Sequence, residues 1–210
     1  MKKIYSKLCA LINRNRKTHL FLWSLLVIGI ITGSFFIVLL DKTDKLYVSN
    51  QITNFFSNVK TGENLNYWTA LVNAIVSNFS ICLIIWLLGI SVIGIPIVLF
   101  ILFSKGFILG FSIGAIIYKY KISGLLLSLV YTTPHIIINT FLIMVISYYS
   151  FMFSMNMVVS LIKKKNLTLK SGINKYLKVL TICLAGFLLT SLFEVFVTPK
   201  LLKFFGFLIK

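Results

Sequence analysis

The chain has 210 residues, of which 59% are hydrophobic and 12% are charged, and its mean hydropathy is +0.98. Because a soluble domain has about 25% charged residues, this composition excludes an ordinary water-soluble fold. Lysine and arginine number 21 against four acidic residues, so the net charge is +17. Nearly all of the basic residues lie between apolar runs, and we therefore expect membrane lipids rather than nucleic acid as their partner. The sequence predicts an all-α polytopic membrane protein.

The first apolar run, residues 19–40, has 22 uncharged residues, enough to cross a hydrocarbon core about 30 Å thick. Residues 1–18 precede it with six basic residues and apolar side chains at helical spacing. They predict a cytoplasmic amphipathic arm that lies on anionic lipid or that serves only as a topology signal. Residues 19–210 then form a single integral membrane helical domain.

A polar loop follows, residues 41–66, and it contains apolar side chains at positions i, i+4, i+7, i+8 and i+11. Asn, Ser, Thr and Gln fill the opposite face, so the spacing predicts an amphipathic helix of about three turns. This helix could lie on the outer leaflet or offer its apolar face to a partner. The candidate partner-binding residues are Val48, Ile52, Phe55, Phe56 and Val59.

The next charge-free stretch, residues 64–104, is too long for one helix and suits two. Glycine and proline are the strongest turn markers, and they place the break between two spans, residues 71–88 and 95–118. The residues that mark the break are Gly89, Gly94 and Pro96.

Pro134 divides the following charge-poor stretch into two unequal parts. The first, residues 122–133, is too short to cross, whereas a fourth span fits residues 134–158. The two parts are either a half-helix followed by a span or one broken helix.

A fifth span, residues 177–197, is expected to end before Pro199. Residues 1–18 carry six basic residues, as do residues 163–176 together with Lys178, whereas the other connections are more sparsely basic. Because basic residues favour the cytoplasmic side, we expect five spans, a cytoplasmic N-terminus and a C-terminus outside.

Glycines recur at every fourth position in the first and third spans. Small residues at this spacing let two helix backbones approach closely. They could join the subunits of a homo-oligomer or pack helices within one chain. The helix-packing candidates are Gly29, Gly33, Gly106, Gly110 and Gly114.

Lys105 and Glu194 are the full charges deep in the apolar spans, where each costs about 2.5–3.5 kcal/mol on insertion scales. His135 and Asn139 are expected at a depth similar to that of Glu194. These four residues predict an intramembrane polar cluster. It either relays protons or ions, as in a small membrane transporter or channel, or fixes the register of the helices.

The chain has few side chains suited to acid–base catalysis. It contains four carboxylates and two histidines, and the histidines are far apart in sequence. The cysteine spacing does not suit zinc, and neither a phosphate-binding loop nor a dinucleotide-binding glycine pattern is present. No nucleophile–base pair can be named. We expect no enzymatic activity, no cofactor and no metal.

Several short motifs of the sequence together resemble the stage II sporulation protein M family. They fall in four of the spans, and the five-span layout and the length also match that family over the whole chain. The motifs are Leu88–Gly89, Gly94–Ile95–Pro96, Lys105–Gly106–Phe107 with Gly110–Phe111, Thr133–Pro134–His135, and Phe193–Glu194 with Thr198–Pro199.

The resemblance implies a bacterial membrane protein of endospore formation, located in the mother-cell membrane at the sporulation septum. It further implies a non-catalytic scaffold that recruits and positions peptidoglycan-remodelling enzymes, stage II sporulation proteins P and D, during forespore engulfment. The outside surface expected to carry this role comprises residues 41–66, the turn at 119–121 and the tail at 200–210.

Overall fold

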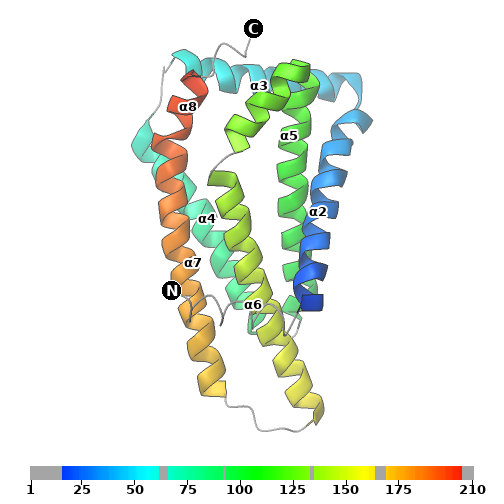
Figure 1. Ribbon diagram of the computed structural model, residues 1–210, viewed down its shortest axis with the longest axis vertical. Coiled ribbons are helices and arrows are strands. Elements are labelled where there is room, and N and C mark those ends of the chain that lie inside the picture. Colours follow the sequence, from blue (N-terminus) through cyan, green and yellow to red (C-terminus); the bar gives the residue numbers. More distant parts are fainter. Residues whose placement is uncertain (1–15, 62–65, 92, 133–134, 164–168, 205–210) are drawn as a thin grey trace.

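The computed structural model describes residues 16–61, 66–91, 93–132, 135–163 and 169–204 (Figure 1). Within these ranges the chain is helical almost throughout and contains no strand. Five of its helices are long and apolar enough to cross a membrane, which confirms the predicted all-α polytopic bundle. The helices are α2 (Arg16–Leu39), α3 (Lys42–Thr61), α4 (Tyr67–Gly89), α5 (Gly94–Thr132), α6 (His135–Lys163), α7 (Leu169–Phe196) and α8 (Thr198–Phe204).

The long helices run along the long axis of the molecule and alternate in direction (Figure 1). Helix α3 lies across one end of the bundle, and α8 is at this same end, which we call the α3 end. Helices α6 and α7 reach farthest toward the opposite end. Helix α2 packs chiefly against α5, whereas α4, α6 and α7 contact one another.

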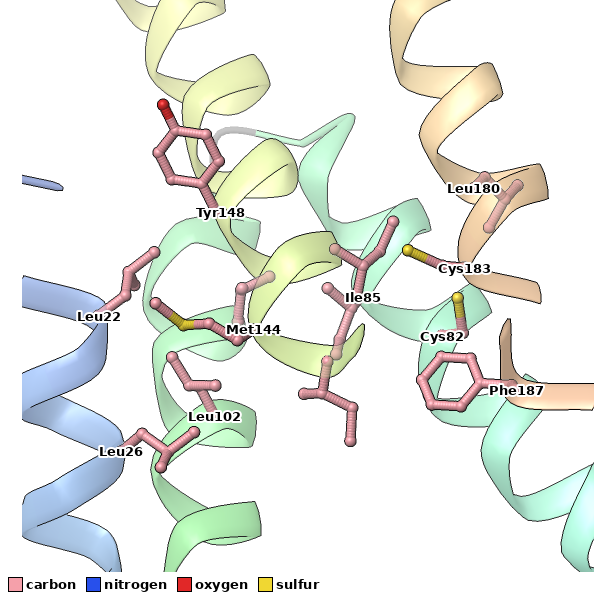
Figure 2. Close-up of a cluster of buried hydrophobic side chains, with 13 residues drawn as sticks. Leu22, Leu26, Cys82, Ile85, Leu102, Met144, Tyr148, Leu180, Cys183 and Phe187 are labelled. Atoms are coloured by element: carbon pink, nitrogen blue, oxygen red, sulfur yellow. The ribbon is translucent and has the colours of Figure 1, made fainter. Parts of the chain in front are cut away.

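Apolar side chains from five helices form the main core, in the half of the bundle away from α3 (Figure 2). Leu22 of α2, Leu102 of α5 and Met144 of α6 meet on one side of it, and Ile85 and Phe187 lie on the other. Large apolar side chains also cover the outside of the long helices. Such a surface suits contact with lipid chains rather than with water.

Helix α5 reverses direction at Lys121, whose φ of 53° and ψ of −124° are not helical. Gly124 lies directly after the reversal, and a Cβ there would come within 2.5 Å of the Ile116 carbonyl oxygen. Residues 122–132 therefore turn back from the α3 end toward the start of α6 (Figure 1). This short segment and α6 follow one another in the same direction, which fits the second alternative, one broken helix (Figure 1).

The end of the fifth span differs from the prediction, because the helical path continues beyond Pro199 as α8. Pro199 is the second residue of α8, in the first turn, where its missing N–H is not needed for an intrahelical bond. The Val197 N–H donates to Phe193 O at 2.9 Å, and Leu201 N–H donates to Val197 O at 3.0 Å. These bonds carry the chain across the junction.

The first span begins earlier than expected, since α2 already includes Arg16. Residues 1–15 of the predicted amphipathic arm lie outside the described residues. The second span also begins earlier, at Tyr67 rather than residue 71, because Asn66 caps it. The Asn66 side chain accepts a hydrogen bond from the Thr69 N–H at 3.2 Å, satisfying one of the first unpaired N–H groups of α4.

Candidate functional site

A cavity of about 450 Å³ lies near the α3 end, between α4, α6, α7 and α8. Tyr67, at the start of α4, and Phe55 of α3 line it at this end. Six polar side chains also line it, although most of its wall is apolar. They are Asn66, Thr69, Asn73, His135, Glu194 and Thr198.

A second cavity, of about 280 Å³, lies between α4, α5, α6 and α7. Glu194 lines both cavities, so its carboxylate marks where they adjoin. The other polar residues around the second cavity are Asn78, Lys105, Ser112, Asn139 and Thr140. The α3 half of the bundle therefore contains several polar groups between its helices.

Lys105 of α5 and Glu194 of α7 face the same cavity from different helices, and their opposite charges attract each other. Both side chains are half-buried. Although both are within the described residues, no direct ion pair within 4.0 Å joins them. The cavity thus contains one positive and one negative group that do not touch.

His135 is the first residue of α6 and only 3% of its surface is exposed. Its Nδ1 lies 3.1 Å from Thr198 Oγ1, at hydrogen-bond distance, and Thr198 is the first residue of α8. The pair ties the start of α6 to the start of α8. His135 lines the first cavity, whereas Lys105 and Asn139 line the second.

Amide side chains hold α7 against its neighbours beside the second cavity. Asn139 of α6 accepts a hydrogen bond from Thr190 Oγ1, and Asn78 of α4 donates to Ser191 Oγ at 3.1 Å. The hydroxyl residues Thr190 and Ser191 were missed by sequence reasoning, and Thr198 was named only as part of a family motif. Single hydroxyls in an apolar run give no spacing signal, and only their polarity could have marked them.

All five helix-packing glycines lie in the contact between α2 and α5 of one chain. A Cβ on Gly29 would be 2.5 Å from the Phe103 carbonyl oxygen, and one on Gly106 would be 2.5 Å from that of Leu26. Ser34 Oγ also donates across this contact to Gly110 O at 3.0 Å. Of the two alternatives, packing within the chain is the one that the structure contains.

The residues of the predicted span break lie where α4 ends and α5 begins, with Pro96 in the first turn of α5. A Cβ on Gly94 would overlap the Leu88 carbonyl group. Gly89 leaves room for the hydroxyl groups of Tyr176 and Ser150, which approach α4 from α7 and α6. Tyr176 donates to Trp86 O at 2.8 Å, and Ser150 donates to Ile85 O at 2.9 Å. This attachment of the α4 end was not predicted.

The amphipathic helix exists as α3, but its apolar face is turned toward the bundle. Phe56 is 2% exposed and packs with Ile52 against residues of α5 and α8, whereas Phe55 is 45% exposed. Phe56 therefore stabilises the fold. It is not accessible to a partner, contrary to the expectation that it is a partner-binding residue. Val48 is half-buried, and the side chain of Val59 lies outside the described residues.

Helix α3 is also fixed by polar contacts. The Lys119 ammonium group donates to Ser49 Oγ at 2.6 Å and to Ser49 O at 3.3 Å. Lys45 donates from its ammonium group to Val38 O at 2.9 Å, at the C-terminal end of α2. Helix α3 also carries exposed residues that take no part in the buried cluster around Phe56, and we call them the platform face. They are Leu46, Tyr47, Asn50 and Asn54.

The fold and these cavities define a multi-pass α-helical membrane protein with polar groups between the helices in one half of the bundle. A family model described as stage II sporulation protein M matches residues 21–199, from α2 to the start of α8. The chain therefore belongs to the stage II sporulation protein M family and is a sporulation-related membrane protein. No curated protein and no solved structure matches the chain.

Proposed function

We propose that the protein is a non-catalytic scaffold in the mother-cell membrane at the sporulation septum. It recruits and positions the peptidoglycan-remodelling enzymes stage II sporulation proteins P and D during engulfment of the forespore. Membership of the family supports the sporulation role. The basic residues near the inner ends of the spans support a cytoplasmic N-terminus and a C-terminus outside. In this orientation the α3 end faces the cell wall.

The observation that carries the proposal is the way in which α3 is held. A buried aromatic residue, Phe56, and the contact between Lys119 and Ser49 fix α3 across the end of the bundle. A fixed helix loses little conformational entropy when a partner docks, which favours binding. Tyr47 is 66% exposed on the platform face, and tyrosine is enriched among the residues that dominate binding energy.

The test is capture of the two enzymes by the full chain after co-expression and solubilisation in a mild detergent. Two platform-face substitutions, Tyr47→Asp and Asn50→Arg, are combined in one variant. We expect this variant to retain less than a tenth of the captured enzymes while its amount in the membrane is unchanged. Ile173→Asp is the matched control, because Ile173 is 42% exposed near the start of α7, at the opposite end.

The control should capture both enzymes as well as the unchanged chain does. Undiminished capture by the Tyr47/Asn50 variant would show that the enzymes dock elsewhere. If the unchanged chain captures neither enzyme, the scaffold role itself is wrong.

A further inference from the structure

The two cavities around Glu194 lead inward from the α3 end of the bundle. The first is lined by Asn66 and Tyr67, at the N-terminal end of α4, and both residues are exposed. Their polar side chains, with Asn73 about two turns further along α4, suit water rather than lipid chains. Glu194 also lines the second cavity, whose wall includes Lys105.

The apolar core closes the inner end of this path. Ile143 lines the second cavity and also belongs to the core. Leu102 lies three residues before Lys105 on α5 and is fully buried in the core, where Leu26 and Met144 flank it (Figure 2). The path is therefore a blind pocket in this conformation and not a pore through the bundle.

Charged groups inside the apolar part of a bilayer are costly to keep. Such residues usually pair with one another or face water or a ligand. Glu194 and Lys105 line the same space without direct contact, so each retains capacity to bind an opposite charge. A molecule with an ammonium and a carboxylate group would complement both.

The pocket also has the size and polarity for such a molecule. Volumes of about 450 and 280 Å³ compare with about 300–1,000 Å³ for typical small-molecule sites. Thr140 and Asn139 lie beside the charged groups and supply hydrogen-bonding atoms that can orient a ligand. A single amino acid fits this description better than a peptide or a lipid chain does.

We infer that the two cavities form one water-filled vestibule, open at the α3 end and closed at the core, that binds a small zwitterion of the amino-acid class. Glu194 binds the ammonium group of this molecule and Lys105 binds its carboxylate. The inference does not depend on the scaffold role, since none of the platform-face residues lines either cavity.

The first experiment tests whether water reaches the vestibule from one side only. Asn73→Cys and Thr140→Cys are treated in sealed, oriented vesicles with a membrane-impermeant, charged methanethiosulfonate reagent, in a chain with Cys9→Ser. We expect both to react from the α3 side, and Leu102→Cys in the core to stay unmodified. Native Cys82 and Cys183 are buried in the core and serve as internal controls. An unreactive Thr140→Cys, or a Leu102→Cys that reacts as fast, would overturn the vestibule.

The second experiment tests the ligand class with glycine as the probe, by calorimetry on the full chain in lipid nanodiscs. We expect glycine to bind and to protect Thr140→Cys from the reagent, whereas methylammonium or acetate alone binds at least tenfold more weakly. Glu194→Gln and Lys105→Gln should each weaken glycine binding at least tenfold. Lys175→Gln is the matched control, because Lys175 is exposed near the opposite end and its loss should change nothing.

A double variant with both Lys105→Gln and Glu194→Gln separates loss of binding from misfolding, since the two lost charges cancel. We expect it to be folded by circular dichroism and gel filtration, and to bind no glycine. Glycine binding that survives in the double variant would overturn the proposed site. Equal binding of methylammonium would overturn the zwitterion class, and absence of glycine binding to the unchanged chain would overturn the ligand. Enzyme capture by the double variant should be normal, which distinguishes this result from failure of the scaffold role.

Discussion

The contact between α2 and α5 makes a quantitative prediction about single methyl groups. A Cβ on Gly29 would lie 2.5 Å from the Phe103 carbonyl oxygen and 3.1 Å from the Phe107 nitrogen. Ordinary van der Waals contact begins at 3.4 Å, so the two backbones would have to separate by roughly 0.9 Å at this point. Both obstructing atoms belong to the backbone of α5 and cannot move aside alone.

Such a separation weakens every contact along the interface. A gap of about 0.5–1 Å already removes a quarter to a half of the dispersion attraction between facing atoms. Overpacking a close contact costs about 1–3 kcal/mol, while replacing glycine by alanine inside a helix gains up to about 1 kcal/mol of propensity. We therefore expect Gly29→Ala to lower the free energy of unfolding by up to about 2 kcal/mol.

Gly172→Ala is the matched control for this substitution. A Cβ on Gly172 would meet only the Phe153 ring, at 3.6 Å, an ordinary contact. The control should therefore be neutral or slightly stabilising. Reversible denaturation in mixed micelles, followed by circular dichroism, measures both variants. If Gly29→Ala is as stable as Gly172→Ala, close approach of the two backbones does not stabilise the bundle.

Three further substitutions, one of them with a matched control, test the packing and hydrogen bonds by the same denaturation assay. Phe56→Ala should cost about 3–5 kcal/mol because it opens a cavity beneath α3, whereas Phe55→Ala, at a half-exposed position, should cost under about 1.5 kcal/mol. Tyr176→Phe removes one hydrogen bond to the end of α4 and should cost about 0.5–1.5 kcal/mol. Thr198→Val leaves the buried His135 without its α8 partner and should cost about 1–3 kcal/mol. Equal losses for Phe55→Ala and Phe56→Ala, or unchanged stability in the other two, would contradict the observed contacts.

The number and kind of helices could be predicted because a span depends on a local property, an apolar run of about 20 residues. The short helical segment before Pro134 followed from the same rule, since that run is too short to cross. The end of the fifth span was harder. Proline ends a helix only where a hydrogen-bonded N–H is required, and Pro199 lies in the first turn of α8, where none is needed.

The spacing of the apolar residues in α3 could not predict which part of the protein its apolar face packs against. A period of 3.6 residues shows that one face is apolar, but not what covers it. The cover for Phe56 comes from α5 and α8, far along the chain. The glycine pattern had the same limit, because Gly29 and Gly110 fit equally well between two chains or within one. Only the tertiary fold brings α2 against α5.

For the polar cluster, the sequence identified individual residues but not how they are arranged in a site. Lys105 and Glu194 were marked by their cost in an apolar span, and the sequence left open whether they fix helix register or relay protons or ions. Register is already fixed by neutral contacts, since Asn139 holds Thr190 and Asn78 holds Ser191 on α7. A buried charge pair is weak evidence for stability even when its geometry is excellent, and this pair makes no direct contact. The role that remains for the Lys105–Glu194 pair is to bind a molecule that enters the space between the two charges.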